Sequence, residues 1–452
     1  MRIPQRTSQF NKVVSLAKRF SHTRKGPKIS IRRLAGNQRL IKKLKNLQRD
    51  NTMQNFYNTV IIGGGASGLM CAVELLSGKN RLSGSDVIIL ERNDRVGKKL
   101  VATGNGQGNL TNQNLGCEFF HGDKSFIDGF LSSEKEIDLC KYLEKLGIPL
   151  TALKDGKIYP LSRQASAVLD VLRAFIAHYG CQEKTGAEVD SIVKSGNLFK
   201  VRANGVEHLA KNVVFAVGGK AGKQFGTDGS AYKLIEKFGH SCSDLYPSLV
   251  QLKTDTTLIK GLKGLKETAL VTAIVNGKKV KSATGDLLFT EFGVSGSTVF
   301  SVSSAVASAS SAQLKIEFLP EKSQDEIEQI LTDKLNMPFV KKEDVLVGVI
   351  NKRIGQAVLK TVKDFTPKAI AKALKNFNLN VQGTLGFNYA QVTRGGIKTD
   401  SVDVKTMQSK NVPNLYIVGE VLDVDGDCGG YNLTFAFVTG IVCARHVKSK
   451  TE

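Results

Sequence analysis

The clearest hydrophobic pattern in the chain is a short β-branched run followed by a helical one. Residues 58–62 read Asn-Thr-Val-Ile-Ile, which is typical of a strand buried on both faces. After a glycine-rich turn, residues 69–76 are rich in apolar side chains and predict a helix. A second apolar run, residues 86–90, then ends in Glu91. This order predicts a strand–helix–strand unit of a parallel sheet.

The turn in this unit, Gly63-Gly-Gly-Ala-Ser-Gly68, has the spacing G-x-G-x-x-G. Gly63 permits the tight turn, Gly65 lets the backbone approach a pyrophosphate, and Gly68 allows the helix to pack closely on the strand. The free amides of the helix N-terminus favour an anion. Glu91 follows Gly68 by 23 residues (91 − 68), where a carboxylate accepts hydrogen bonds from ribose hydroxyls. The unit therefore predicts a dinucleotide site.

A second strand–turn–helix pattern near the C-terminus indicates which dinucleotide binds. Residues 414–418 are an apolar run ending in Gly419-Glu420, and residues 426–432 read Gly-Asp-Cys-Gly-Gly-Tyr-Asn. An apolar helix is predicted over 433–447, and the amides at its start would stabilise negative charge on a reduced flavin ring. An FAD site needs this second unit, whereas a plain NAD site does not, so FAD is predicted.

The middle of the chain predicts a β-rich segment and a helical one. Val, Leu and Thr alternate around residues 247–275, as in strands, whereas residues 321–376 show helical spacing. Two helix starts are marked in the second segment. Ser323-Gln-Asp-Glu is a capping box, and Thr366-Pro367 places a proline in the first turn.

Charge is the unusual feature of the composition. The 452 residues include 64 Lys and Arg against 41 Asp and Glu, a net charge of +23. Residues 1–50 hold 15 of the basic residues and one acid, so the remainder carries 49 − 40 = +9. This balance favours a polyanionic partner such as nucleic acid. The best apolar run, residues 435–444, is shorter than the roughly 18 residues that a membrane span needs, so no span is expected.

The basic N-terminal extension, residues 1–56, is predicted to be disordered or partly helical. Ile41, Leu44 and Leu47 recur at helical spacing among Lys and Arg, a pattern that suits contact with RNA or a membrane surface. A solvated charge run, an organelle transit peptide and a true start at Met53 are the alternatives.

Cysteine and histidine spacing gives no metal or redox site. The seven cysteines contain no Cys-x-x-Cys pair, and the six histidines have no metal-ligand spacing. Reduced thiols favour a cytoplasmic location, with an organelle as the alternative if residues 1–50 are a transit peptide. The sequence has no second strand–G-x-G-x-x-G–helix unit for NAD(P)H. A transient NAD(P)H donor would therefore have to reach the flavin directly.

Six motifs, in order along the chain, resemble those of the HI0933-like flavoproteins, also called the aminoacetone oxidase family of FAD-binding enzymes. They are ILERNDRVGKKLVATGNGQGNLTN at 89–112, YPLSRQASAV at 159–168, FAVGG at 215–219, LLFTEFGVSG at 287–296, VTRGG at 392–396 and GEVLDVDG at 419–426. Many members have Arg-Cys before Asn-Leu-Thr-Asn, where this chain has Gln107-Gly108, so a chemistry of that cysteine does not apply here.

The resemblance implies an α/β fold in which a Rossmann-like FAD-binding domain carries an inserted β-barrel-like domain and a small helical subdomain. The FAD-binding domain would comprise residues 57–245 and 393–452. The barrel-like insert would occupy 246–318 with a return strand at 377–392, and the helical subdomain would occupy 319–376.

The matching motifs also imply which residues hold FAD. Lys98 and Lys99 would reach the phosphates, Asn105 and Asn109 the ring edge, and Asp425 the ribityl hydroxyls. The full expected set is Gly63, Gly65, Ala66, Ser67, Gly68, Glu91, Arg92, Lys98, Lys99, Asn105, Gly106, Asn109, Gly218, Gly219, Gly419, Glu420, Asp425, Gly429, Gly430, Tyr431 and Asn432.

The resemblance implies an FAD-dependent oxidoreductase and leaves its substrate open. The family includes enzymes that make dihydrouridine in large-subunit ribosomal RNA by adding hydride across the C5=C6 bond of uracil, and the basic charge favours this function. A small-molecule oxidoreductase of the amine oxidase or enone reductase type is the alternative, and a flavin-containing RNA-binding or assembly factor is a third. For the RNA reaction, Cys428 is the candidate proton donor, with a packing role as its alternative, and Tyr431 is a candidate for stacking on the base. Arg394 is the candidate ligand of either a substrate phosphate or the flavin pyrophosphate.

Overall fold

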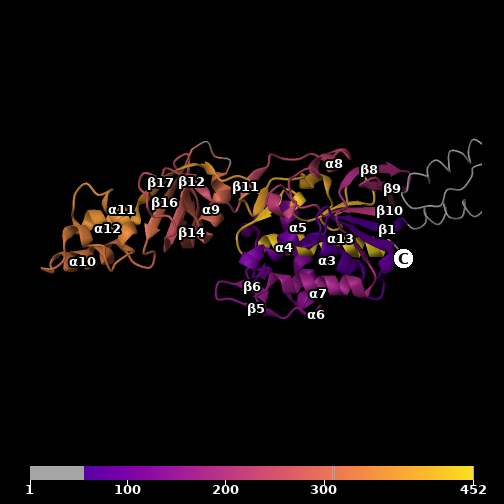
Figure 1. Ribbon diagram of the computed structural model, residues 1–452, viewed down its shortest axis with the longest axis horizontal. Helices are drawn as coiled ribbons and strands as arrows, with labels where there is room; N and C mark the ends of the chain where they lie inside the picture. Colours follow the sequence, from indigo (N-terminus) through magenta and orange to yellow (C-terminus); the bar gives the residue numbers. More distant parts are fainter. Residues whose placement is uncertain (1–54, 308, 310, 451–452) are drawn as a thin grey trace, which may run out of the picture. The chain divides into compact units, whose positions relative to one another are not determined.

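The computed structural model describes residues 55–450 except 308 and 310 (Figure 1). The chain divides into two compact units, Met1–Phe56 and Tyr57–Glu452, and the elements below belong to the second apart from the first residue of β1. The helix predicted within the N-terminal extension lies outside the described residues. Within the described part, no helix combines the length and the apolar character that crossing a membrane requires.

A seven-stranded sheet forms the centre of the nucleotide-binding domain. Along the sheet its strands are β7 (Gln182–Lys184), β2 (Val87–Leu90), β1 (Phe56–Ile62), β10 (Val206–Phe215), β9 (Leu198–Ala203) and β8 (Val189–Ser195), with β19 (Leu415–Ile417) also paired to β10. The strands β7, β2 and β1 are parallel, and almost every residue of β1 and β2 is buried, as their unbroken apolar runs predict. The second half of β10 pairs in parallel with β19, so both ends of the chain build one sheet.

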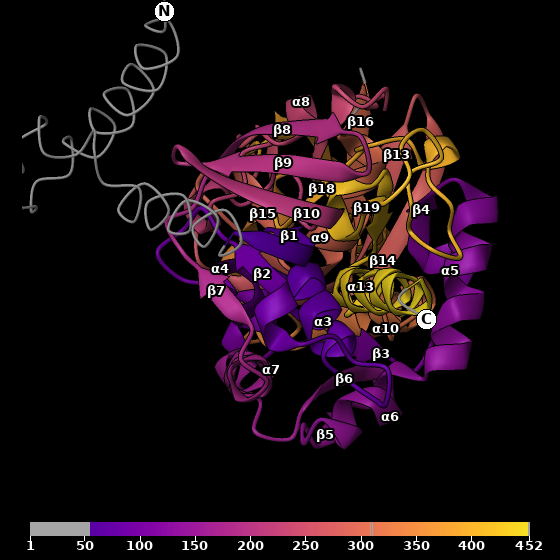
Figure 2. The same cartoon turned by 90° about the vertical axis from the view of Figure 1, so that its right-hand side faces the viewer.

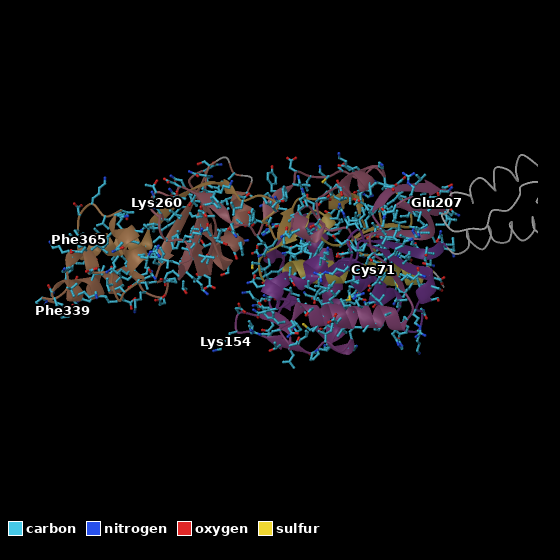
Figure 3. The ribbon with its side chains drawn as sticks, in the orientation of Figure 1. Cys71, Lys154, Glu207, Lys260, Phe339 and Phe365 are labelled. Atoms are coloured by element: carbon cyan, nitrogen blue, oxygen red, sulfur yellow. The ribbon has the colours of Figure 1, made fainter. Side chains whose placement is uncertain are left out.

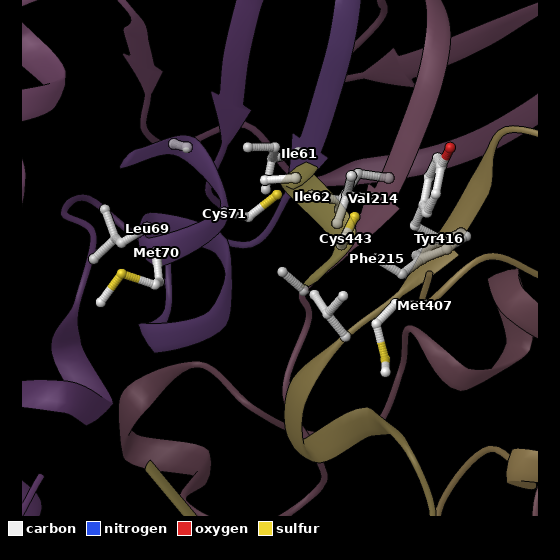
Figure 4. Close-up of a cluster of buried hydrophobic side chains, with 14 of the residues drawn as sticks. Ile61, Ile62, Leu69, Met70, Cys71, Val214, Phe215, Met407, Tyr416 and Cys443 are labelled. Atoms are coloured by element: carbon white, nitrogen blue, oxygen red, sulfur yellow. The ribbon is translucent and has the colours of Figure 1, made fainter. Parts of the chain in front are cut away.

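Helices α3 (Ala66–Leu75) and α13 (Tyr431–Ser449) pack side by side beneath this sheet (Figure 2). Their close approach requires Gly440, because a Cβ there would lie 2.5 Å from the carbonyl oxygen of Ser67. The same contact brings the thiols of Cys71 and Cys443 together in the core (Figure 4). Burial and the hydrogen bond with Cys71 raise the pKa of Cys443, which favours two packing thiols.

Smaller elements complete the nucleotide-binding domain. The helices are α4 (Lys98–Val101), α5 (Lys124–Ile137), α6 (Leu139–Lys145), α7 (Ala165–His178) and α8 (Tyr232–Glu236), and the short strands are β3 (Thr111–Asn112), β4 (Phe120–Gly122), β5 (Leu150–Ala152), β6 (Lys157–Pro160) and β20 (Val424–Gly426). β4 pairs with β20, so the segment around residue 121 meets the segment that precedes α13, and β3 pairs with β6.

The insert is a closed six-stranded barrel, as expected. Its strands follow one another around the barrel as β12 (Leu252–Thr254), β15 (Gly293–Ser295), β14 (Lys278–Phe289), β13 (Lys266–Val275), β16 (Ala312–Phe318) and β17 (Phe377–Thr384), with α9 (Ser297–Val306) packed on β13 and β14. The strands β11 (Tyr246–Ser248) and β18 (Val392–Arg394) pair with each other and not with the barrel, although both ranges fall wholly or partly within the predicted insert. The exact domain boundaries stay predictions.

The helical subdomain consists of α10 (Gln324–Leu335), α11 (Lys352–Leu359) and α12 (Pro367–Lys375). Both predicted helix starts are confirmed. Ser323 and Glu326 form the capping box of α10, and Thr366 caps α12 by accepting a hydrogen bond from the Ala369 amide. The apolar faces of the three helices share one hydrophobic core with the barrel, so insert and subdomain stabilise each other.

We expect Lys448→Met to lower the free energy of unfolding by about 3 kcal/mol, because it leaves a buried carboxylate without its nearest cation. The Lys448 ammonium lies 2.7 Å from Glu74 Oε1, and both side chains are largely buried between α13 and α3. Denaturant unfolding measures this loss. Lys145→Met on the exposed surface of α6 is the control and should change stability by less than about 0.5 kcal/mol. Equal unfolding free energies for Lys448→Met and the parent protein would contradict a stabilising ion pair between Lys448 and Glu74.

Candidate active site

The glycine-rich turn has the geometry of a dinucleotide cradle. Gly63 has φ +102°, and a Cβ there would lie 2.3 Å from the Ala216 carbonyl oxygen. A Cβ on Gly68 would lie 2.0 Å from the Gly63 carbonyl oxygen, so helix and strand touch at this glycine. A Cβ on Gly65 would meet no atom within 4 Å. Gly65 therefore opens onto free space at the start of α3, where a pyrophosphate fits.

Glu91 directly follows β2, and its side chain binds the backbone of the glycine-rich turn. Its carboxylate accepts hydrogen bonds from the Gly64 amide at 2.8 Å, and from the Asn93 amide and side chain at 2.8 and 2.7 Å. The side chain is buried. Glu91 thus fixes the backbone of the glycine turn, and the ribose contact expected of it stays a prediction.

The charged residues expected at the phosphates and ribityl chain bind protein groups. The Lys99 ammonium donates to Glu420 Oε2 at 2.7 Å and to the Ala221 carbonyl at 3.1 Å. Glu420 also accepts the Thr393 amide at 3.0 Å. Arg92 forms a two-pronged ion pair with Asp228, at 2.9 and 3.2 Å. These contacts join four segments of the chain, at residues 92–99, 221–228, 393 and 420. The local sequence around each residue does not predict them.

Further predicted ligands lie around this network. Lys98 pairs with Asp94 at 2.6 Å one helical turn earlier. Gly219 packs against Thr393, since a Cβ there would lie 2.4 Å from the threonine hydroxyl oxygen, and Gly419 packs against Ser67 in the same way at 2.6 Å. Asn105, Gly106 and Gly218 have left-handed backbones, and Ala66 begins α3.

The second glycine-rich loop, residues 426–432, is held in shape by three asparagines before α13 begins. Asn432 accepts the Gly426 amide at 2.9 Å and donates to the Gly426 carbonyl at 2.7 Å. Asn112 donates to the Gly429 carbonyl at 2.9 Å, and the Asn109 amide bridges the Thr111 carbonyl and the Gly430 amide. Gly430 lies so close to β3 that a Cβ would come within 2.4 Å of the Thr111 oxygen. These contacts therefore tie the loop and the start of α13 to β3 through protein groups alone.

A cluster of charged residues joins this loop to the barrel. His121 Nε2 lies 2.8 Å from Asp427 Oδ1, and Lys281 of β14 donates to the same oxygen. Burial alone would raise the pKa of Asp427, but His121 and Lys281 outweigh it and hold that pKa below its usual range. No local pattern predicts that His121 contacts Asp427, because only the pairing of β4 with β20 brings the two residues together. No group of His, Cys, Asp and Glu in the described residues could hold a metal ion.

Asp425, two residues earlier, is almost completely buried and accepts a hydrogen bond from the Ser248 hydroxyl at 3.1 Å. Burial raises its pKa to about 6, although His121 and Arg394 oppose this. The folded protein therefore keeps the Asp425 proton between about pH 4 and 6, whereas the unfolded chain loses it. Stability contributed by this residue falls across that window and stays lower above it.

Asp425→Asn should remove this pH dependence. The parent protein loses stability between pH 4 and pH 7 and the variant does not. We therefore expect the difference in unfolding free energy, variant minus parent, to increase by up to about 3 kcal/mol over this range. This figure follows from a pKa shift of about two units at 1.36 kcal/mol each. Denaturant unfolding at the two pH values measures it, with Asp423→Asn as the matched control. The same difference at both pH values would contradict a buried, protonated Asp425.

The three candidate catalytic residues lie in different surroundings. Burial raises the pKa of the Cys428 thiol. Arg394 donates to the Ser304 carbonyl of α9 at 2.7 Å, which leaves further donors on its guanidinium. Tyr431 is buried, with its ring stacked on Phe119 at 4.7 Å between centroids and set edge-on to Phe120. This surrounding favours a packing role for Tyr431 over stacking on a substrate base.

Comparison with known proteins decides the family. The model of the HI0933-like protein Rossmann domain matches residues 57–446, which include both glycine-rich loops and the barrel. The chain belongs to this HI0933-like family. It is 33% identical over 402 residues to the 3-dehydro-bile acid delta(4,6)-reductase of Clostridium scindens, covering 85% of this chain and 97% of that protein.

A second HI0933-like relative has a different substrate in its name. The ribosomal RNA dihydrouridine synthase of Haemophilus influenzae is 27% identical over 409 residues, covering 87% of this chain and 98% of that protein. Among solved structures, the 3-ketosteroid-delta4-(5alpha)-dehydrogenase of Rhodococcus jostii covers 87% of this chain and 97% of its own, with 14% identity and a TM-score of 0.48. This HI0933-like protein is an FAD-dependent oxidoreductase, and the glycine cradle at Gly65 suits the cofactor.

Proposed function

We propose that the protein reduces a carbon–carbon double bond conjugated with a carbonyl group, and that its substrate is a uracil of large-subunit ribosomal RNA. The observation that carries the first half is the shared chemistry of two relatives. A dihydrouridine synthase saturates the C5=C6 bond of uracil, and a delta(4,6)-reductase of a 3-dehydro steroid saturates bonds conjugated with its ketone. Both reactions add hydride to one carbon and a proton to the carbon nearer the carbonyl.

Charge favours RNA as the substrate. The protein carries a net +23, and residues 51–452 alone carry 49 − 40 = +9. Such an excess strengthens binding to a phosphate backbone and brings no benefit to a neutral small substrate. The second candidate, a reductase of a small enone, is favoured by the 33% identity to the bile acid enzyme. An amine oxidase has no comparable support.

FAD, when bound and reduced, would supply the hydride. The Gly63–Gly68 turn and the Gly426–Asn432 loop would hold the cofactor, and Cys428 would deliver the proton, since a thiol carries a proton at neutral pH. Arg394 would bind a substrate phosphate through its free donors. NAD(P)H as the reductant would have to reach the flavin directly, since the described residues contain one G-x-G-x-x-G turn and no second nucleotide-binding unit. Reduction of the flavin by another donor is the alternative.

The cellular test is the dihydrouridine content of ribosomal RNA. RNA from cells with and without the gene is digested and quantified by mass spectrometry, with cytoplasmic and organellar ribosomes kept separate to test the expected cytoplasmic location. We expect one dihydrouridine to disappear and to return when the protein is restored. Unchanged dihydrouridine, with no second enzyme that makes it, would contradict the RNA substrate and favour a small enone.

A further inference from the structure

Helices α11 and α12 and the loop between them expose a run of cations. Residues 352–372 contain six Lys and Arg and one acid, Asp364. The six are Lys352, Arg353, Lys360, Lys363, Lys368 and Lys372, and all are exposed. Lys352 lies 3.6 Å from Asp344. The other five have no ion pair with any residue of the described chain, so their charge is free for a partner.

The barrel extends this run. The guanidinium of Arg353 lies beside Gly261, where a Cβ would come within 3.7 Å of its Nη2 atom. Lys260, the neighbour of Gly261, is exposed and likewise has no ion-pair partner among the described residues. Ile259 and Leu262 are buried in the shared core and anchor this loop. We call Lys260, Arg353, Lys360, Lys363, Lys368 and Lys372 the cationic face.

Acidic side chains are kept on a different helix. α10 exposes Asp325, Glu326 and Asp333, whereas α11 and α12 together expose basic side chains and no acid. This separation leaves the exposed Asp364 as the one acid within residues 352–372, so the cationic face keeps a large excess of positive charge, which increases its attraction for a polyanion.

Two phenylalanine rings are exposed in the same subdomain. Phe339, in the segment after α10, is 80% exposed, and Phe365, directly before α12, is 38% exposed. Figure 3 labels both rings on the helical subdomain and Lys260 on the adjoining barrel. Phe365 falls between Lys363 and Lys368 in the sequence. Exposed rings among cations are the combination that holds single-stranded nucleic acid, because bases stack on the rings while phosphates meet the cations.

We propose that the cationic face with Phe339 and Phe365 binds a single-stranded segment of RNA. The inference rests on the proposed function for the identity of the polyanion. A membrane surface is the competing partner, but a helix lying on a membrane must turn its apolar face outward. The apolar residues of α11 and α12, among them Ile354, Val358 and Ile370, are instead buried in the core shared with the barrel. The two helices offer a partner their cations, and the segments between the helices add the two rings and the exposed side chains of Met337 and Val347.

The test measures binding of the full-length protein to a fluorescein-labelled 20-nucleotide oligouridylate by anisotropy at several salt concentrations. The variant combines Lys360→Gln, Lys363→Gln, Lys368→Gln and Lys372→Gln. We expect its affinity at 0.1 M salt to fall at least tenfold. The magnitude of the slope of log affinity against log salt concentration should decrease by about 3, because each of the four lost phosphate contacts contributes roughly 0.7.

A matched control removes the same charge elsewhere, through Lys79→Gln, Lys135→Gln, Lys145→Gln and Lys154→Gln at exposed lysines of the nucleotide-binding domain. Its salt slope should change by less than about 1. Phe339→Ala with Phe365→Ala should weaken binding about 5- to 100-fold with the salt slope unchanged, since stacking is not ionic. Bound FAD and circular dichroism confirm that each variant is folded.

Two outcomes would overturn the proposal. One is equal RNA affinity and salt slope for the cationic-face variant and its control. The other is unchanged RNA binding together with lost binding to vesicles of phosphatidylserine and phosphatidylcholine, which would assign the face to membranes. Failure of the proposed function is distinguishable, because RNA binding would then depend on the cationic face while no ribosomal dihydrouridine depends on the gene.

Discussion

A protein carrying Gly65→Val is expected to purify folded but without bound FAD. The backbone of Gly65 has φ −84°, which valine adopts readily, and a Cβ there meets no protein atom within 4 Å. The added side chain would instead fill the space beside the amides at the start of α3. Losing one or two hydrogen bonds to a charged pyrophosphate should weaken FAD binding at least about 100-fold. Visible flavin absorbance and FAD titration of the purified protein measure this.

Two further glycine variants act as controls. Gly65→Ala adds less bulk at the same site and should weaken FAD binding to a smaller extent. Gly68→Ala forces a Cβ to within 2.0 Å of the Gly63 carbonyl oxygen, so it should lower the melting temperature as well as FAD content. Full FAD occupancy in folded Gly65→Val would show that the cofactor does not approach this turn.

Replacing Cys428 by alanine should lower kcat by at least about 100-fold while FAD content stays unchanged. The thiol carries a proton at neutral pH that it can donate to the substrate carbon, although burial raises its pKa and so makes it a weaker acid than an exposed thiol. A positioned proton donor contributes 10²- to 10⁴-fold to the rate. Steady-state reduction of the RNA substrate measures kcat, and the flavin spectrum reports the cofactor.

Cys117→Ala, at an exposed cysteine, is the matched control and should leave kcat unchanged. Cys428→Ser keeps a proton on a smaller atom and should retain more activity than the alanine variant. If Cys428→Ala turns over at the rate of the parent protein, Cys428 is a packing residue and the proton comes from another group.

Sequence periodicity was sufficient for the nucleotide-binding elements. β1 and α3 follow directly from a β-branched run, three spaced glycines and an apolar helix, and each glycine meets the steric demand that its spacing predicts. The helix starts at Ser323 and Thr366 could also be predicted from the sequence, because a helix cap depends on residues only three positions apart. The barrel was expected from the resemblance rather than from local pattern alone.

Contacts between distant segments could not be predicted in this way. Lys99 and Glu420 are separated by 321 residues, and His121 and Asp427 by 306, so each pair depends on how the two parts of the nucleotide-binding domain come together. For the same reason the widely spaced Cys71 and Cys443 gave no sign of meeting. Long-range pairing of polar side chains requires the tertiary fold, which one sequence does not reveal.

The central claim is best tested by reconstitution. Purified protein with bound FAD is mixed with NADPH and ribosomal RNA from cells that lack the gene, and dihydrouridine is quantified by mass spectrometry. We expect dihydrouridine to form at one uridine of large-subunit RNA, with NADPH consumed in equal amount, and none to form with Gly65→Val. Reduction of a small enone by the same preparation, with no dihydrouridine formed when either NADPH or NADH is supplied, would contradict the RNA substrate.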